Sequence, residues 1–336
     1  MKKYLLQIIL ILLGVTPCLA AEPQLITVAV PGPRNLSYLP IDLIPRIGAD
    51  IAEGVRLRIQ YTSGGGVALG KMANRDADFA VAGLPAQMSM RTGGGDVMTI
   101  APVDDLTLFI LMVRSDLKGK VKRVADLKGR TIGVNSGSLT SKTTSQQLAE
   151  LLLKNSGVKL SEVRILPTGQ SWEEQSSVVT TGGVDAMMGN EPFASRLLAD
   201  KQVFFLLNMA DPAAVRQMPG SGFLHAALAT RSDLIKMQPE KVARMVAAVR
   251  RVLIWMSSKT PQEIVAALNI KDKAEQEALL ASLTKYKRLY STDAKFSTSQ
   301  LRETEIFFKA SSGAGSAAVP VKIEEMIMDR WAGRKP

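Results

Sequence analysis

Short apolar runs recur along the chain, and most are followed by a glycine- or hydroxyl-rich turn and then a segment with helical spacing. Runs such as LITVAV and VRLRIQY are rich in β-branched or alternating residues, which is typical of buried strands. We expect strands at residues 25–30, 55–61, 78–82, 97–101, 106–113, 131–134, 163–166, 184–188, 203–207 and 222–230.

Segments whose apolar residues have helical spacing lie between most of these runs. Residues 239–257 carry apolar side chains at steps of three and four, which predicts an amphipathic helix. Thr260 to Glu263 reads as a capping box with Pro261 at the first helical position. We expect further helices near 39–52, 67–74, 144–154, 171–181, 274–286, 298–309 and 321–331, another after Pro192, and a glycine-rich surface loop at 88–96.

The alternation of strands and helices predicts an α/β fold with mostly parallel sheets flanked by helices. The pattern restarts near residue 126, so we expect two lobes, with the strand at 106–113 crossing to the second and that at 222–230 returning. The expected lobe 1 is residues 21–105 plus 209–310, and lobe 2 is residues 106–208. Residues 311–336 would add a flexible segment and a C-terminal helix.

The N-terminus has the layout of a secretory signal peptide over residues 1–20. Lys2 and Lys3 precede an apolar run at residues 5–13, and small residues precede Ala21. The run is shorter than the roughly 20 residues that span a bilayer, so a membrane anchor is the weaker alternative. Anchoring through a lipid on Cys18 is disfavoured because Pro17 precedes it. We therefore expect a protein that is secreted through a cleavable signal peptide.

The composition excludes or disfavours several classes of function. Of 336 residues 46% are hydrophobic, enough for a sizeable core, and removal of Lys2 and Lys3 lowers the formal charge from +11 to +9. Cleavage would also remove Cys18, the single cysteine, and with it disulfides and thiolate chemistry. Lysine and arginine are scattered and only 5% of residues are aromatic, which disfavours nucleic-acid binding.

The candidate chemistry is that of binding. The stretch 124–144 predicts a strand, a turn rich in serine and glycine, and a helix start, which suits an anion or a polar ligand group. It offers no base, nucleophile or metal ligand. His225 lies in an apolar stretch and is interpreted as structural, and the pairs Asp104–Asp105 and Glu173–Glu174 are too close in sequence to form a carboxylate dyad. No metalloprotease, calcium-loop or nucleotide-binding motif occurs, so we expect no cofactor and no metal.

Four segments, in order, resemble one family. They are TSGGG at 62–66, RDADFAVAG at 75–83, DLKGRTIGVNSGS at 126–138 and GGVDAMMGNEPF at 182–193. The chain is similar to periplasmic solute-binding proteins of ABC importers, within the group that binds nitrate, sulfonates, taurine and thiamine precursors. The resemblance implies a monomeric two-lobed protein of the type II periplasmic binding fold, which closes over a small solute and delivers it to a membrane permease and its ATPase.

The resemblance also implies where the solute would be bound. Donor-rich loops and Arg34 favour a small anion such as a sulfonate, carboxylate or phosphate. A sensory or scaffold protein of the same fold is the alternative, and an enzyme is disfavoured because no nucleophile–base set is present. The expected contacts are Arg34, Asn35, Ser63, Gly64, Gly65, Gly83, Leu84, Ser136, Gly137, Ser138, Leu139, Thr140, Asn190 and Glu191.

Overall fold

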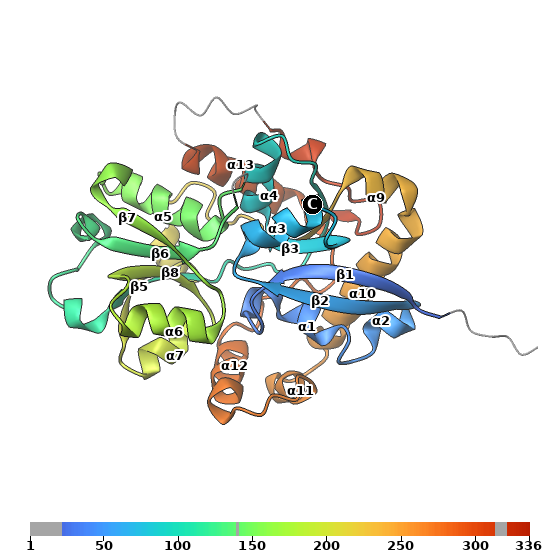
Figure 1. Cartoon of the computed structure of the whole chain (residues 1–336), viewed down its shortest axis with the longest axis horizontal. Helices are drawn as coiled ribbons and strands as arrows, with labels where there is room; N and C mark the ends of the chain where they lie inside the picture. Colours follow the sequence, from blue (N-terminus) through green and yellow to red (C-terminus); the bar gives the residue numbers. More distant parts are fainter. Residues whose placement is uncertain (1–21, 139–140, 313–320) are drawn as a thin grey trace, which may run out of the picture.

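Two five-stranded sheets lie side by side in the computed structural model, which describes residues 22–138, 141–312 and 321–336 (Figure 1). The expected signal peptide therefore lies outside the described residues. The strands are β1 (Gln24–Pro31), β2 (Val55–Thr62), β3 (Phe79–Gly83), β4 (Met98–Pro102), β5 (Phe109–Arg114), β6 (Thr131–Asn135), β7 (Arg164–Thr168), β8 (Ala186–Asn190), β9 (Val203–Asn208), β10 (Ala226–Thr230), β11 (Phe296–Ser297) and β12 (Arg334–Lys335).

Each large sheet contains one strand that runs against its neighbours. The first sheet has the order β2-β1-β3-β10-β4, with β10 antiparallel to β3 and β4. The second has the order β7-β6-β8-β5-β9, with β5 antiparallel to β8 and β9. The reversed strands are the first that the chain enters after each crossing between sheets. The predicted α/β fold with two sheets is confirmed, and both sheets are mixed.

Helices cover the faces of both sheets. They are α1 (Leu39–Leu43), α2 (Ala49–Ala52), α3 (Gly65–Ala73), α4 (Leu84–Thr92), α5 (Thr144–Asn155), α6 (Trp172–Thr180), α7 (Phe193–Ala199), α8 (Pro212–Val215), α9 (Ser232–Met237), α10 (Pro239–Ser257), α11 (Pro261–Ala267), α12 (Lys273–Lys285) and α13 (Thr298–Ser311). The short 3-10 helices are η1 (Leu36–Tyr38), η2 (Ser115–Leu117), η3 (Val124–Leu127), η4 (Leu160–Glu162) and η5 (Ile323–Glu325).

Burial follows the sequence pattern in β5 and α10. In β5, Phe109 and Leu111 pack into the cluster on one face of the second sheet, and Ile110 and Met112 pack into the cluster on the other. Both faces are covered, which explains its unbroken apolar run. The predicted apolar side of α10 is buried against the first sheet, as expected from its spacing.

Two C-terminal helices lie where the sheets adjoin. α12 contacts α7 of the second sheet, and α13 contacts α4 of the first sheet and α5 of the second. Figure 1 shows α12 (orange) and α13 (red) at opposite ends of the boundary between the sheets. Both helices were predicted, but their position between the sheets has no local signal in the sequence.

The predicted loop at residues 88–96 is wrong, because α4 occupies most of it. Pro85 lies in the first turn of this helix, where its missing N–H costs nothing. Gln87 is fully buried and its amide donates to the carbonyl oxygens of Ala82 (3.0 Å) and Ala227 (2.9 Å). Met88 and Met90 are also buried. Tertiary packing therefore holds a helix where glycine and charge suggested a loop.

The predicted helix at 321–331 is also wrong. Only η5 forms, and then Met326 and Met328 bond through their backbones to the N–H (2.7 Å) and C=O (2.8 Å) of Thr99. Thr99 lies on the edge strand β4, so the free backbone groups of that edge bind the segment in extended form. The expected flexible segment lies largely outside the described residues.

The predicted helix at 39–52 is divided into α1 and α2. Pro45 lacks the N–H that would continue α1, and Gly48 has a left-handed φ of 69°. The result is a short α1 that begins directly after η1, in the segment that follows the carboxyl end of β1.

Candidate functional site

Loops of the two sheets touch through glycines. A Cβ on Gly64 would overlap the carbonyl oxygen of Ser136, and one on Gly66 would lie 2.7 Å from the Cα of Gly137. A side chain at Gly83 would likewise overlap the hydroxyl of Thr144. Since real Cβ atoms do not come this close to other atoms, only glycine lets the loops meet. The sheets are therefore in a closed arrangement.

A small cavity lies between these loops. Its volume is about 10 Å³, which is room for about one water molecule. It is lined from the first sheet by residues that include Tyr38, Gly83 and His225, and from the second by residues that include Thr144 and Gln170. The site thus draws on both halves of the chain.

Five polar side chains near this cavity each keep one buried atom without a hydrogen-bond partner. Asn35, Ser37, Thr144, Gln170 and Asn190 are each 3% exposed or less. Leaving such a group unpaired costs about 1–3 kcal/mol, so native proteins keep few of them. The unpaired atoms are Asn35 Nδ2, Ser37 Oγ, Thr144 Oγ1, Gln170 Oε1 and Asn190 Nδ2. Their gathering at one junction indicates a site that a polar molecule completes.

Local structure fixes the direction of the Asn35 amide. Its Oδ1 caps η1 by accepting the backbone N–H of Ser37 at 3.0 Å, so Nδ2 must point elsewhere. Leu36, between them, donates its N–H to the carbonyl oxygen of Glu191 at 2.9 Å. Asn190 in turn lies 3.4 Å, Oδ1 to Nε2, from the amide of Gln170. These bonds bring η1 of the first sheet against the end of β8 of the second.

Tyr38 and His225 line the cavity and, with Asp104 behind them, form a buried row of three polar side chains. His225 Nδ1 lies 3.1 Å from Asp104 Oδ2, and His225 Nε2 lies 3.4 Å from the Tyr38 hydroxyl. The carboxylate accepts the Nδ1 proton, which leaves Nε2 for Tyr38 or for a ligand. Burial, and secondarily the charge of Asp104, raise the pKa of Tyr38 far above its ordinary value, so its hydroxyl keeps its proton. Phe109 packs edge-on to the imidazole at 4.8 Å.

His225 is thus held on all sides, in keeping with the structural role predicted for it, but it also faces the cavity. The Asp104 carboxylate bonds to His225 with one oxygen, and its other oxygen accepts the N–H of Ala226 at 2.7 Å. It is therefore directed toward these groups rather than toward Asp105. No serine, threonine or cysteine among the described residues is hydrogen-bonded to His225.

Several predicted contacts are occupied by the protein itself. The Arg34 guanidinium pairs with Glu275 of α12 at 3.0 Å, and the Ser136 hydroxyl donates to the carbonyl oxygen of Thr168 at 2.9 Å. The Glu191 carboxylate accepts from the hydroxyls of Ser195 (2.7 Å) and Tyr286 (3.1 Å). These three charged or hydroxyl groups hold the site together rather than face an open space.

The other predicted residues lie along the contact between the sheets. Gly65 and Gly83 line the cavity, and Leu84 is buried with its N–H bonded to the carbonyl of His225 at 2.7 Å. Ser138 bonds through its backbone to Ser141 at 3.0 Å. Ser63, Gly64 and Gly137 belong to the touching turns, Asn35 and Asn190 supply unpaired donors, and Leu139 and Thr140 lie outside the described residues.

Sequence reasoning missed Ser37, Tyr38, Thr144 and Gln170 as site residues. The first two lie only two and three positions beyond Asn35, so the capping motif was a usable signal. Gln170 follows β7 directly, in a loop at the carboxyl end of a strand. Thr144 had no signal, because it reads as an ordinary first residue of a helix.

Over the part of the chain that the structure describes, no cluster of three or more histidine, cysteine or acidic residues could hold a metal ion. No described helix is both long and apolar enough to cross a membrane.

Comparison with known proteins adds a family and a fold. Residues 51–264 match the family model described as NMT1/THI5 like. A protein from Bordetella bronchiseptica RB50 has a structure with a TM-score of 0.82 at 19% identity, covering 93% of this chain and 96% of its own. No curated protein matches the sequence.

Two further structures are of binding proteins. The alkanesulfonate-binding protein SsuA from Xanthomonas axonopodis pv. citri, bound to MOPS, has a TM-score of 0.70 at 16% identity, with 92% and 99% of the two chains covered. The periplasmic nitrate-binding protein NrtA from Synechocystis PCC 6803 has a TM-score of 0.62 at 13% identity, with 77% and 69% covered. The chain therefore has the periplasmic binding protein fold, and the predicted resemblance is confirmed.

Proposed function

The chain belongs to the NMT1/THI5-like family, and from this premise we propose that it is the periplasmic solute-binding component of an ABC-type uptake system. It would capture a small solute between two lobes and deliver it to a membrane permease. We assign residues 21–105 and 209–310 to the first lobe and residues 106–208 to the second. The crossings of the chain between the sheets support this division.

One observation carries the proposal: buried polar atoms without partners come from both sheets and meet at one junction. Asn35 and Ser37 extend from the first sheet, and Thr144, Gln170 and Asn190 from the second. A solute that bonds to both sets would stabilise the closed arrangement over an open one, which is how binding is linked to lobe closure. An arrangement for catalysis would need a nucleophile and base in reach of each other.

The same atoms support a class of solute. Asn35 Nδ2, Ser37 Oγ, Thr144 Oγ1 and Asn190 Nδ2 can all donate, while Gln170 Oε1 is the acceptor among them. Among the described residues, no lysine or arginine lines the cavity. Arg34, the predicted cation, is paired with Glu275 instead. We therefore propose an oxygen-rich acceptor, an organic sulfonate or carboxylate, that is held by neutral donors rather than by a cation. The cavity of about 10 Å³ holds only a water molecule, so the side chains that line it must move apart to admit this solute.

The experiment is a thermal-shift screen against small sulfonates, carboxylates, nitrate, sugars and amines, followed by calorimetry. A ligand at 100 times its Kd stabilises the folded protein by about 2.7 kcal/mol, which such a screen detects. We expect organic oxyanions to raise Tm, and the paired variant Asn35→Ala with Asn190→Ala to remove the shift. Tight binding of a sugar or an amine alone would overturn the solute class.

A matched control separates loss of the site from loss of the fold. Asn155 is exposed at the opposite end of α5 from Thr144, which lines the cavity, so Asn155→Ala tests the effect of removing an amide alone. It should leave the ligand-induced shift unchanged. If no solute of any class stabilises the protein, the proposed function itself is wrong.

A further inference from the structure

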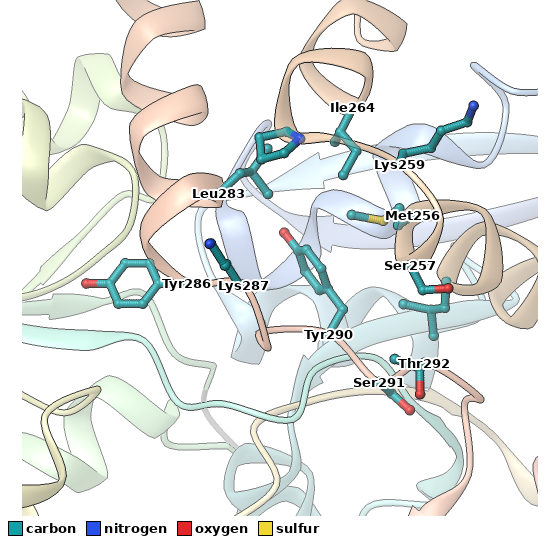
Figure 2. Close-up of a pocket in the computed structure, with 12 residues that line it drawn as sticks. Met256, Ser257, Lys259, Ile264, Leu283, Tyr286, Lys287, Tyr290, Ser291 and Thr292 are labelled. Atoms are coloured by element: carbon teal, nitrogen blue, oxygen red, sulfur yellow. The ribbon is translucent and has the colours of Figure 1, made fainter.

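A second pocket lies away from the contact between the sheets. It has a volume of about 260 Å³ and is enclosed by the C-terminal end of α10, by α11, by the end of α12 and by the segment after α12 (Figure 2). Its wall is largely apolar, with Leu253, Met256, Ile264 and Leu283 among the lining side chains. An engineered apolar cavity of about 150 Å³ holds benzene, so this pocket has space for a bicyclic aromatic molecule.

Two tyrosines connect the pocket to the solute site. Tyr286 and Tyr290 line the pocket, and their hydroxyls donate to the Glu191 carboxylate (3.1 Å) and to the carbonyl oxygen of Leu36 (2.7 Å). Figure 2 shows the Tyr286 hydroxyl directed out of the pocket, toward the second sheet. Glu191 and Leu36 bond to each other and flank the unpaired amides of Asn190 and Asn35.

The same segment is attached to a crossing between the sheets. Asp105 donates its N–H to the carbonyl oxygen of Leu289 at 2.7 Å, and Ser291 donates its N–H to Val103 at 3.3 Å. Residues 103–105 lead from β4 to β5, and therefore from one sheet to the other. Any displacement of Tyr290 by an occupant of the pocket acts on both the crossing segment and the loop that carries Asn35.

The charged side chains at the pocket indicate which class of ligand it would bind. Lys287 lines the pocket, is exposed, and forms no ion pair with the described acidic residues. Lys259, the other lysine of the pocket, is held by Glu263 at 3.0 Å. An apolar wall with one uncompensated ammonium group suits a small amphiphilic anion, whose ring or chain would be buried while its carboxylate meets Lys287.

We propose that this pocket is a second binding site, for a small aromatic or branched aliphatic carboxylate, and that its occupancy changes the affinity of the solute site. The coupling rests on the proposed function, whereas the pocket's own binding does not. Because coupling between two sites is reciprocal, the solute must change the affinity of the carboxylate by the same factor.

The test uses 2-naphthoate as the probe and the full mature chain, with binding followed by the fluorescence of the probe. We expect saturable binding that weakens about tenfold in Lys287→Gln, as loss of one charge-assisted hydrogen bond predicts. Lys236→Gln is the control, since Lys236 is also exposed and lies on α9. Ile264→Trp should fill the pocket and abolish binding, whereas Ile254→Trp, at a residue 52% exposed on α10, should not.

Binding that is absent, or that survives both Lys287→Gln and Ile264→Trp, overturns the site. The coupling is measured separately, as the solute Kd with and without saturating 2-naphthoate. A change of threefold or more in wild type, absent in Ile264→Trp, supports it, and an unchanged Kd overturns the coupling while the site stands. If no solute is found, the probe titration still decides whether the pocket binds.

Discussion

Gly64 lies against the carbonyl oxygen of Ser136, so closely that a Cβ on Gly64 would overlap it. The backbone at Gly64 is extended, with φ 170°, a conformation that alanine adopts without strain. Gly64→Ala should therefore fold normally but resist the contact between the sheets. Overpacking of this kind costs about 1–3 kcal/mol, so we expect solute affinity to fall by about fivefold or more, measured by calorimetry.

Gly70 provides the control for this substitution. It lies in the adjoining helix α3, and a Cβ there would meet nothing within 4 Å. Gly70→Ala should leave the affinity unchanged and stabilise the helix by up to about 1 kcal/mol. If Gly64→Ala binds as tightly as Gly70→Ala, the contact seen between Gly64 and Ser136 does not belong to the solute-bound state.

Neighbouring threonines should give opposite results. The Thr144 hydroxyl is buried without a partner, so Thr144→Val should weaken solute binding about tenfold while the free energy of unfolding stays equal or rises. The Thr143 hydroxyl caps α5 by accepting the N–H of Gln146 at 3.3 Å, and donates to Asn135 at 3.1 Å. Thr143→Val should lower the free energy of unfolding by about 1 kcal/mol.

Urea unfolding and calorimetry on both variants check this pair. Equal loss of affinity in the two variants would mean that the Thr144 hydroxyl does not contact the solute. Equal loss of stability would mean that Thr144 has an internal partner in solution.

The sequence predicted the strands well because their signal is local. The apolar runs at β1, β5 and β8 are bounded by turns or polar residues. The crossing to the second sheet and the return were expected at residues 106–113 and 222–230, where β5 and β10 lie. The errors at α4 and η5 have tertiary causes. Gln87 is held in α4 by carbonyl groups of β3 and β10, and the residues after η5 are bound by Thr99 on the edge of β4.

The predicted site residues lie on loops that meet between the sheets, but of the five side chains with unpaired atoms there only Asn35 and Asn190 were among them. Which loops meet follows from strand order, whereas which hydroxyls remain unpaired depends on internal partners that lie far away in sequence. Ser136 and Thr144 have the same chemistry, yet Thr168, 32 residues from Ser136, takes up one hydroxyl while the other remains unpaired. No pattern in the stretch 124–144 distinguishes them.

Substitutions in the Arg34–Glu275 ion pair would show whether a cation contacts the solute. Their side chains pair at 3.0 Å and are 34% and 20% exposed, which predicts a coupling of about 1 kcal/mol or less in a double-mutant cycle of stability. Because the guanidinium is turned toward α12, Arg34→Gln should change solute affinity by less than threefold. A loss of tenfold or more, without coupling to Glu275→Gln, would show that Arg34 binds the solute directly.

Asp42 should make the stability of the free protein depend on pH. Burial raises its pKa to about 6, although hydrogen bonds from the Arg34 N–H and the Tyr61 hydroxyl act in the opposite direction. Between its ordinary value of 3.8 and 6 the folded chain binds this proton more tightly than the unfolded chain. The stabilisation is therefore complete below about pH 4 and is lost as the pH rises through 6. A difference of about two units between the folded and unfolded pKa values corresponds to about 3 kcal/mol of stability.

Urea unfolding of wild type and Asp42→Asn between pH 4 and 7 isolates this contribution, because all other groups titrate alike in both proteins. We expect the wild type to lose stability relative to Asp42→Asn as the pH rises from 4 through 6, and the difference to level off near pH 7. Asp116 provides a control of opposite sign, since its hydrogen bond from Arg114 lowers its pKa. Relative to Asp116→Asn, the wild type should gain stability as the pH rises through the acid range. If Asp42→Asn leaves the pH profile of the wild type unchanged, the Asp42 carboxylate is ionised in the folded protein over the whole pH range measured. The Arg34 N–H is then bound by a carboxylate anion instead of a neutral carboxylic acid.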